Sequence, residues 1–144
     1  DLYNQRIKDV VFNWDKILNF DGETGPYVQY TYARCASVMR KAGDVTIPEE
    51  IDYSVLTDDV TMNLLKDITR FPEVIKDAAD KYEPFMISRF AVSVAQHFNK
   101  FYHDCQINVE DENVKMARLK VVSITMRVIK DALALLGIEC PEQM

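Results

Sequence analysis

The sequence predicts an all-α fold, a helical bundle of about six helices. Apolar residues recur at steps of three and four in six stretches, which is the spacing of one helical face. No stretch shows the convincing apolar–polar alternation of a half-buried strand, and the connections are mostly short. With 144 residues, 48% hydrophobic and 28% charged, the chain fits one globular domain with a single core.

The first two helices are expected over residues 2–18 and 26–42. The first is predicted by apolar residues on one face: Ile7, Val10, Val11, Trp14, Ile17 and Leu18. After the loop NFDGETG, Pro26 stands where a first helical residue can do without its N–H. Gly43 stands where a left-handed residue ends a helix.

The middle of the chain predicts a loop and three helices. DVTIPEEIDYS is polar and typical of a surface loop, after which Thr57 is expected to cap a helix. Pro72 starts a short helix, and Pro84 starts a long one that ends near Asp104. Their apolar positions are Val60, Leu64, Ile68 and Phe71; then Val74, Ile75, Ala78, Ala79 and Tyr82; then Phe90, Val94, Phe98, Phe101 and Tyr102.

The last expected helix is long and strongly amphipathic. Asn108, followed three residues later by Asp111, indicates its start, and Gly137 indicates its end. Between them an apolar stripe is expected to be core: Val114, Ala117, Val121, Ile124, Val128, Ala132 and Leu135.

Charge and cysteine content limit the classes of function. The net charge of -6 gives no general attraction to phosphates, so an RNA site must be a local patch that works by stacking and shape. Cys35, Cys105 and Cys140 are far apart and lack a C-x-x-C, so we expect reduced thiols and no metal, even at His103 and Cys105. No apolar run approaches the roughly 20 residues of a membrane span, and we expect a cytoplasmic protein without membrane contact.

One face of the second helix carries the candidate chemistry. A rotation of about 100 degrees per residue brings together two aromatic rings and two cations: Tyr27, Tyr30, Arg34 and Lys41. Flat aromatic rings can stack on an unpaired base, and neighbouring cations can hold its phosphate. The opposite set is expected to be core: Val28, Tyr32, Cys35 and Met39.

Three segments resemble one family over residues 10–144. NFDGETGPYVQYTYARCASVMRKAG is similar to the start of the anticodon-binding domain of arginyl-tRNA synthetases, where a GPY-x-QY-x-x-x-R core is characteristic. VSVAQHFNKFYHDCQI resembles its second recognition helix, and KDALALLGIECPEQM resembles its terminal helix and tail. Two positions depart from the family pattern: its Asp-Ala-Leu-Arg tetrapeptide ends here in Ala134, and its penultimate arginine is Gln143. Charge contacts made by those arginines are therefore in doubt.

The resemblance implies which residues contact tRNA. Tyr27 and Arg34 are expected in the anticodon pocket against the middle base, a cytosine in arginine anticodons, and their seven-residue spacing places them on one helix face. Phe98 and Tyr102 are expected to stack on splayed anticodon bases, and Met144 to pack beside the anticodon. His97 is interpreted as structural and Gln29 as packing.

The resemblance also implies the domain plan. Residues 1–144 are expected to form the anticodon-binding domain, with 1–20 as a connecting helix from a catalytic domain in the same polypeptide, because the chain does not begin with methionine. No catalytic residue is expected: the chain lacks a glycine-rich phosphate loop, a G-x-S-x-G and both class I synthetase signatures. Asp58 and Asp59 are adjacent at an expected helix start, and we interpret them as interacting favourably with the helix dipole rather than as a catalytic pair.

The expected function is therefore recognition of the anticodon loop of arginine tRNA by a monomer. ATP and arginine would bind the catalytic domain of the parent arginine–tRNA ligase, with no cofactor in this chain. Two alternatives stand beside it. One is a helical protein-interaction module anchored by Tyr27, Tyr30, Phe98 and Arg34. The other is the equivalent domain of cysteinyl-tRNA synthetase.

Overall fold

The structure, a computed structural model, describes Trp14, residues 24–43 and residues 45–144. Its elements are α2 (Gly25–Ala42), the 3₁₀-helix η1 (Tyr53–Val55), α3 (Asp59–Thr69), α4 (Phe71–Lys81), α5 (Phe85–Asp104) and α6 (Glu112–Leu135). Within these described residues every regular element is a helix, which confirms the all-α prediction. The count of about six is not confirmed, because the helix expected over 2–18 lies outside the described residues except for Trp14, which is 66% exposed.

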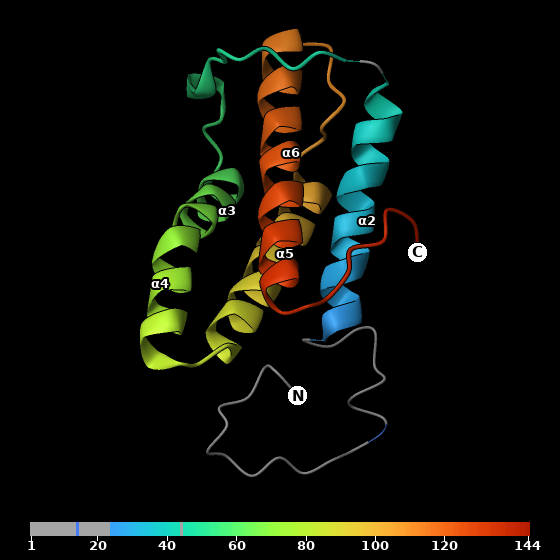
Figure 1. Cartoon of the computed structure of the whole chain (residues 1–144). Coiled ribbons are helices and arrows are strands. Elements are labelled where there is room, and N and C mark those ends of the chain that lie inside the picture. Colours follow the sequence, from blue (N-terminus) through green and yellow to red (C-terminus); the bar gives the residue numbers. More distant parts are fainter. Residues whose placement is uncertain (1–13, 15–23, 44) are drawn as a thin grey trace.

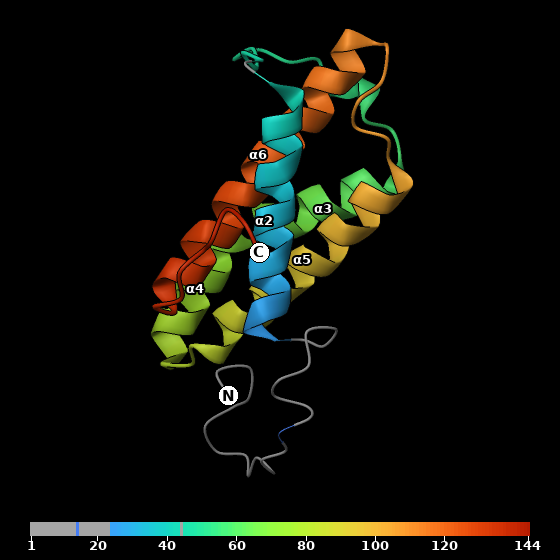
Figure 2. The ribbon, with the colours of Figure 1, turned by 90° about the vertical axis from the view of Figure 1, so that its right-hand side faces the viewer.

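Helix α5 is the centre of the bundle. It packs against α2, α3, α4 and α6, and α2 also packs along α6. Figure 1 shows α2 on one side of α5 and α6, and α3 and α4 on the other. After α6 the chain turns back and its last residues lie beside α2, as Figure 2 also shows. The carboxyl terminus is therefore close to the helix that carries the predicted aromatic and cationic face.

The core follows the predicted apolar stripes in part. In α6 it also includes four residues outside the predicted stripe: Leu119, Val122, Ile129 and Leu133. The largest fully buried side chains are Tyr32, Phe98, Phe101, Leu64, Leu119, Ile129, Leu133, Val28, Val94, Val121 and Val122. Each such side chain stabilises the fold by about 1.5–3 kcal/mol relative to exposure. Some predicted core positions are wrong: Tyr82 is 79% exposed, Leu135 is 54% exposed, and Ala79 is exposed too. Tyr82 has left the helical path, because it ends α4 in a left-handed conformation with φ of 53°.

The helix ends show which residues satisfy the free backbone groups. Pro26 lies in the first turn of α2, and Gly43 ends that helix with φ of 74° while its N–H bonds the Arg40 carbonyl at 3.1 Å. The prediction that Thr57 caps the next helix is wrong, because Asp58 is the cap. Its carboxylate accepts from the Thr61 N–H at 2.7 Å and from the Thr61 hydroxyl at 2.8 Å.

The start of α6 also differs from the prediction by three residues. Asp111 rather than Asn108 is the cap, since its carboxylate accepts from the N–H groups of Asn113 and Val114 at 2.9 and 3.2 Å. Asn108 stays in the preceding loop, where its carbonyl accepts from the Gln106 side chain at 3.2 Å. The aspartate adds negative charge at the helix N-terminus, which the helix dipole favours.

No helix among residues 14, 24–43 and 45–144 is long and apolar enough to cross a membrane.

Candidate nucleic-acid interface

The side chain of Asn99 joins the two residues predicted to read a base. It lies on α5, facing α2, and its Nδ2 donates to the Tyr27 hydroxyl at 2.9 Å and to the Thr31 hydroxyl at 3.1 Å. Its Oδ1 accepts a hydrogen bond from Arg34 Nη1. Thr31 is fully buried, and its hydroxyl donates to the Tyr27 carbonyl at 3.0 Å, one helical turn away. The amide is thus shared among three residues of α2.

This arrangement determines what Tyr27 and Arg34 can offer a ligand. The Tyr27 oxygen accepts from Asn99, so its own O–H is left to donate. Arg34 has five N–H donors and spends one on Asn99. Because both residues bond the same amide, their remaining donors lie close together. The site therefore presents two donor groups that one amide joins.

Two tyrosine rings hold the guanidinium of Arg34. The Arg34 Cζ lies 4.9 Å from the ring centre of Tyr30 and 5.1 Å from that of Tyr102. Both distances suit cation–π attraction, which is worth about 0.5–1 kcal/mol at exposed sites. Tyr30 is 47% exposed and Tyr102 is 40% exposed, so ring surface remains open to solvent beside a fixed cation.

Phe98 does not play the predicted role. Its side chain is fully buried, so direct stacking of its ring on RNA is wrong in this structure. It lies 6.3 Å from the Tyr102 ring centre at an interplanar angle of 27°, and 6.0 Å from Phe101. Phe98 therefore supports Tyr102 from inside the core, and only the outer ring of the predicted pair can meet a base.

A hollow of about 310 Å³ opens between α2, Tyr102 and the end of the chain. Five of the predicted site residues line it: Tyr30, Arg34, Lys41, Tyr102 and Met144. Tyr27 is not among the lining residues, and reaches them only through Asn99 and Arg34.

The chain end is tied to α2 by two side chains. Gln29 Nε2 donates to the Glu139 carbonyl at 2.8 Å, and Arg40 Nη1 donates to the Glu142 carbonyl at 3.1 Å. Glu142, Gln143 and Met144 form one wall of the hollow. Met144 is 58% exposed there. Gln29, interpreted above as packing, therefore anchors the tail.

The groups packed beneath this surface add no negative charge at neutral pH. Burial raises the pKa of the Cys35 thiol and of the Cys140 thiol. Burial also raises the pKa of the Tyr32 hydroxyl, with further contributions from Cys140, Glu142 and Cys35. All three cysteines are free thiols. In the described part of the chain no three His, Cys, Asp or Glu side chains are grouped to hold a metal ion.

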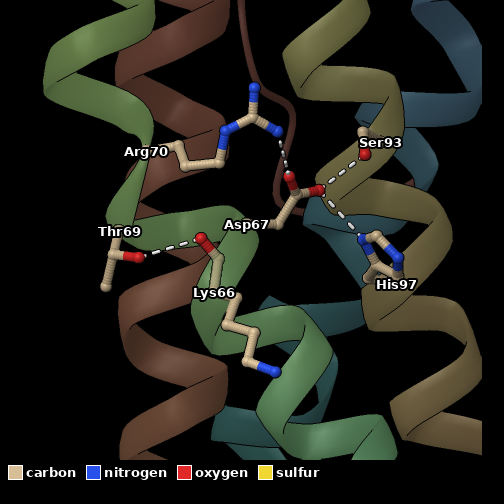
Figure 3. Close-up of polar contacts among 6 residues, drawn as sticks. All are labelled: Lys66, Asp67, Thr69, Arg70, Ser93 and His97. Carbon is tan, nitrogen blue, oxygen red and sulfur yellow. Dashed lines mark hydrogen bonds and ion pairs between the residues drawn. The ribbon is translucent and has the colours of Figure 1, made fainter.

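His97 belongs to a separate polar cluster on the α3 side of α5, shown in Figure 3. Asp67 is only 6% exposed, and its Oδ2 lies 2.9 Å from His97 Nδ1 and accepts from the Ser93 hydroxyl at 2.6 Å. Arg70 lies 3.6 Å from the other carboxylate oxygen. The ring of His97 is thus bound to a buried carboxylate, which confirms its structural interpretation.

Sequence reasoning did not find Asn99, Arg40 or Gln29 as parts of this surface. Asn99 lies between Phe98 and Phe101, two fully buried rings, so it is a polar residue beside the core face of α5. A buried or half-buried amide needs hydrogen-bond partners. That requirement could have indicated from the sequence that Asn99 bonds residues of a neighbouring helix. Nothing in the local pattern distinguishes Arg40 from Lys41, because the tail that Arg40 holds is 102 positions away.

The fold and this surface define a helical anticodon-binding domain. The family model described as the DALR anticodon binding domain matches residues 28–144. The chain belongs to this family.

Similar proteins and structures carry consistent names. The arginine–tRNA ligases of Alkaliphilus metalliredigens (strain QYMF) and Halothermothrix orenii (strain H 168) are 56% and 50% identical over 144 residues, which is 100% of this chain and 25% of each relative. The arginyl-tRNA synthetase structure of Thermus thermophilus superposes with a TM-score of 0.86 at 30% identity over 95% of this chain and 24% of that one. The Plasmodium falciparum structure gives a TM-score of 0.86 at 27% identity over 100% of this chain and 25% of that one. The chain spans about a quarter of the length of these relatives, and their names favour the arginine enzyme over the cysteine enzyme.

Proposed function

We propose that this chain binds the anticodon loop of arginine tRNA on behalf of an enzyme that attaches arginine to that tRNA with ATP. The family and the names of the relatives support the class of function. The observation that carries the proposal is the Asn99 amide, which holds Tyr27 and Arg34 as neighbouring donors beside open tyrosine rings.

The donor pair suits cytosine at the middle anticodon position. The pairing edge of cytosine presents two adjacent acceptors, N3 and O2, which can accept from the Tyr27 hydroxyl and the Arg34 guanidinium. Uracil carries an N–H at the same place, so one donor would face another. A polar group left unpaired in this way costs about 1–3 kcal/mol, which is roughly tenfold or more in affinity. Specificity then comes from a donor left without an acceptor.

Local charge makes RNA binding compatible with an acidic chain. The net charge is -6, yet the hollow is lined by three cations, Arg34, Arg40 and Lys41. The opposing charge on its wall is that of Glu142. Stacking on Tyr30 and Tyr102 supplies the remaining attraction, worth roughly 1–3 kcal/mol for each stacked base.

The proposal extends to the organisation of the parent protein. Residues 1–144 form one anticodon-binding domain, and residues 1–20 connect it to a catalytic domain that binds ATP and arginine. The match of the family to residues 28–144 and the quarter-length coverage of the relatives support this plan. The domain acts as a monomer in the cytoplasm, and its contribution to the reaction is to select the tRNA.

The test is a fluorescence-anisotropy titration at stated salt, because phosphate contacts make RNA affinity salt-dependent. The chain is titrated with an arginine anticodon stem-loop and with the same loop carrying uracil at the middle position. We expect the cytosine loop to bind about tenfold tighter. Tyr27→Phe, which removes only the hydroxyl, should abolish most of that preference. Arg127→Gln is the control, because the side chain of this α6 arginine is 84% exposed and does not line the hollow.

Equal binding of the two loops by the unchanged chain would overturn base recognition. The protein-interaction alternative is favoured by the acidic net charge alone. One of its four proposed anchors, Phe98, is buried and inaccessible to a partner. Under that alternative Tyr27→Ala leaves RNA affinity unchanged, whereas anticodon recognition requires a loss.

A further inference from the structure

Thr31 occupies a position from which its side chain can orient the Asn99 amide. It lies where α2 meets α5, and its side chain is fully buried. Its hydroxyl oxygen accepts a hydrogen bond from Asn99 Nδ2 at 3.1 Å, and the same hydroxyl donates to the Tyr27 carbonyl at 3.0 Å. A threonine hydroxyl has a single proton to donate. Because the Tyr27 carbonyl takes that proton, the hydroxyl can only accept from Asn99.

The bond to Thr31 fixes which end of the amide faces Tyr27. Only the nitrogen end of Asn99 can donate to Thr31, and that nitrogen also donates to the Tyr27 hydroxyl at 2.9 Å. The phenol oxygen therefore accepts from Asn99 and keeps its own proton for a ligand. Three hydrogen bonds close a loop through Thr31, Asn99 and both the carbonyl and the hydroxyl of Tyr27.

The opposite orientation of the amide would reverse what Tyr27 offers a ligand. With Oδ1 of Asn99 turned toward Tyr27 and Thr31, the amide would accept the phenol proton, and the phenol oxygen would offer the ligand only an acceptor. An acceptor at this place suits the N–H of uracil rather than the N3 of cytosine. The Thr31 hydroxyl opposes this orientation, because its oxygen would face Oδ1 without a proton between the two atoms.

Arg34 favours the same orientation from the other end of the amide, where its guanidinium donates to Oδ1 of Asn99. That bond is open to exchange, because Arg34 is only partly buried and its guanidinium is itself proposed to contact the middle base. Thr31 is 0% exposed, so neither water nor RNA can replace its hydroxyl. Thr31 is therefore the constraint on the amide that persists when a base is bound.

We propose that Thr31 is a specificity-determining residue: its buried hydroxyl orients the Asn99 amide, which makes Tyr27 a donor and so selects cytosine over uracil at the middle anticodon position. Thr31 contacts no RNA and acts through Asn99, so it is a positioning residue. The inference rests on the proposed function. It adds that the preference for cytosine depends on a side chain that the RNA cannot reach.

The experiment removes the Thr31 hydroxyl and measures the preference between two RNA loops. Thr31→Val replaces the hydroxyl by a methyl group of similar size, and Thr31→Ser keeps the hydroxyl. Thr125→Val is the matched control, because Thr125 of α6 is also fully buried and its hydroxyl donates to the Val121 carbonyl at 2.8 Å. Each variant is titrated by fluorescence anisotropy with the stem-loops that carry cytosine or uracil at the middle position. Thermal unfolding checks that each variant is folded, and Thr31→Ala removes the same hydroxyl without added volume if Thr31→Val is unfolded.

We expect Thr31→Val to reduce the preference for cytosine from about tenfold to about threefold or less, because the amide loses its buried acceptor and can adopt both orientations. Thr31→Ser should keep the preference of the unchanged chain. Thr125→Val should keep it as well, even where it lowers stability as much as Thr31→Val does. In a Tyr27→Phe chain, Thr31→Val should cause no further change in preference, because the hydroxyl on which it acts is absent.

Failure of this inference can be distinguished from failure of the proposed function. If Thr31→Val keeps the full preference while Tyr27→Phe loses it, Arg34 orients the amide without Thr31; the inference is wrong and anticodon recognition stands. An equal loss of preference in Thr125→Val also overturns the inference, because it reduces the effect of Thr31 to a general loss of stability. If the unchanged chain binds the two loops equally, the proposed base recognition itself fails, and the role of Thr31 fails with it.

Discussion

Asn99 donates its amide N–H to the hydroxyl of Tyr27 at 2.9 Å, across 72 positions of sequence. This bond connects α5 to the aromatic face of α2, and it orients the phenol as a donor toward any ligand. The same amide accepts from Arg34. One residue that contacts no base in our proposal therefore positions two that do.

Asn99→Asp tests this positioning role. Aspartate can still accept from Arg34 but cannot donate, so the Tyr27 hydroxyl must turn its proton toward the carboxylate. We expect affinity for the arginine stem-loop to fall about tenfold or more, and the preference for a middle cytosine to shrink. Anisotropy titrations with the cytosine and uracil loops measure both.

Asn63→Asp is the matched control for charge. Asn63 is exposed on α3 and does not line the hollow beside the tail, so its substitution adds the same negative charge at a distance. An Asn99→Asp variant that weakens both loops by the same small factor as Asn63→Asp would contradict the positioning role.

Local pattern was enough to predict the helices that the structure describes, and to place on one face the two residues that we propose contact the middle base. Tyr27 and Arg34 are seven positions apart, so helical geometry alone brings them together. Asn99 was not predicted, because its role depends on how α5 packs against α2, and periodicity identifies a buried face without identifying the partner. The placement of Tyr27 beside Arg34 follows from the geometry of one helix, whereas the placement of Asn99 follows from the packing of two helices.

The pair Phe98 and Tyr102 shows the same limit within one helix. The two residues are four apart and share a face by spacing, yet one is fully buried and the other is 40% exposed. Helix α5 packs against four neighbours, and Tyr102, in its last turn, lines the hollow beside the tail. Likewise Thr57 and Asp58 can both cap a helix by residue type, and only the bonds to Thr61 decide between them.

Arg40→Met should loosen the tail without unfolding the bundle. Arg40 is exposed, and its guanidinium donates a hydrogen bond to the Glu142 carbonyl at 3.1 Å. Losing this anchor should move Met144 away from the hollow and weaken stem-loop binding about threefold to tenfold. The urea midpoint should change little, because a single exposed hydrogen bond contributes only about 0.5–1.5 kcal/mol.

A truncated chain separates the tail from the charge of Arg40. Removal of residues 142–144 takes away the carbonyl that Arg40 holds. In the truncated chain, Arg40→Met should reduce RNA affinity only by the effect of losing one positive charge. Arg127→Met measures that effect at a remote site. A full additional loss in the truncated chain would show that Arg40 acts on RNA directly rather than through the tail.

Asp67 is expected to support stability rather than binding. Its carboxylate is 6% exposed and is bound by Ser93, His97 and Arg70, as Figure 3 shows. Asp67→Ala leaves these groups without their shared acceptor, and should lower the free energy of unfolding by about 2–4 kcal/mol. Urea denaturation measures the loss.

His97→Ala should cost less, because the ring is 39% exposed and water can replace it at Asp67. Both variants should keep the stem-loop affinity of the unchanged chain at temperatures where they are folded. A loss of RNA affinity in folded His97→Ala, without a shift in the urea midpoint, would instead place the ring in the RNA site.

The cap of α3 should make stability depend on pH. Burial alone would raise the pKa of Asp58, but hydrogen bonds from the Thr61 N–H, the Thr61 hydroxyl and the Cys105 thiol outweigh it, and the pKa lies below its ordinary 3.8. A carboxyl with a lowered folded pKa stabilises the fold above its unfolded pKa, and that contribution is lost as pH falls through the folded value. Asp58→Ala should therefore lower the free energy of unfolding by about 0.5–2 kcal/mol at pH 7.

The difference between Asp58→Ala and the unchanged chain should narrow below about pH 4, because protonation weakens the same hydrogen bonds in the unchanged chain. Urea denaturation at about pH 7, 5 and 3 measures it. Asp59→Ala is the control, since Asp59 is exposed in the first turn of α3 and supplies charge to the dipole without capping Thr61. If the Asp58→Ala difference stays constant over this pH range, the carboxylate does not stabilise the fold through its ionised form. The link that it makes between the start of α3 and Cys105, at the end of α5, would then rest on packing alone.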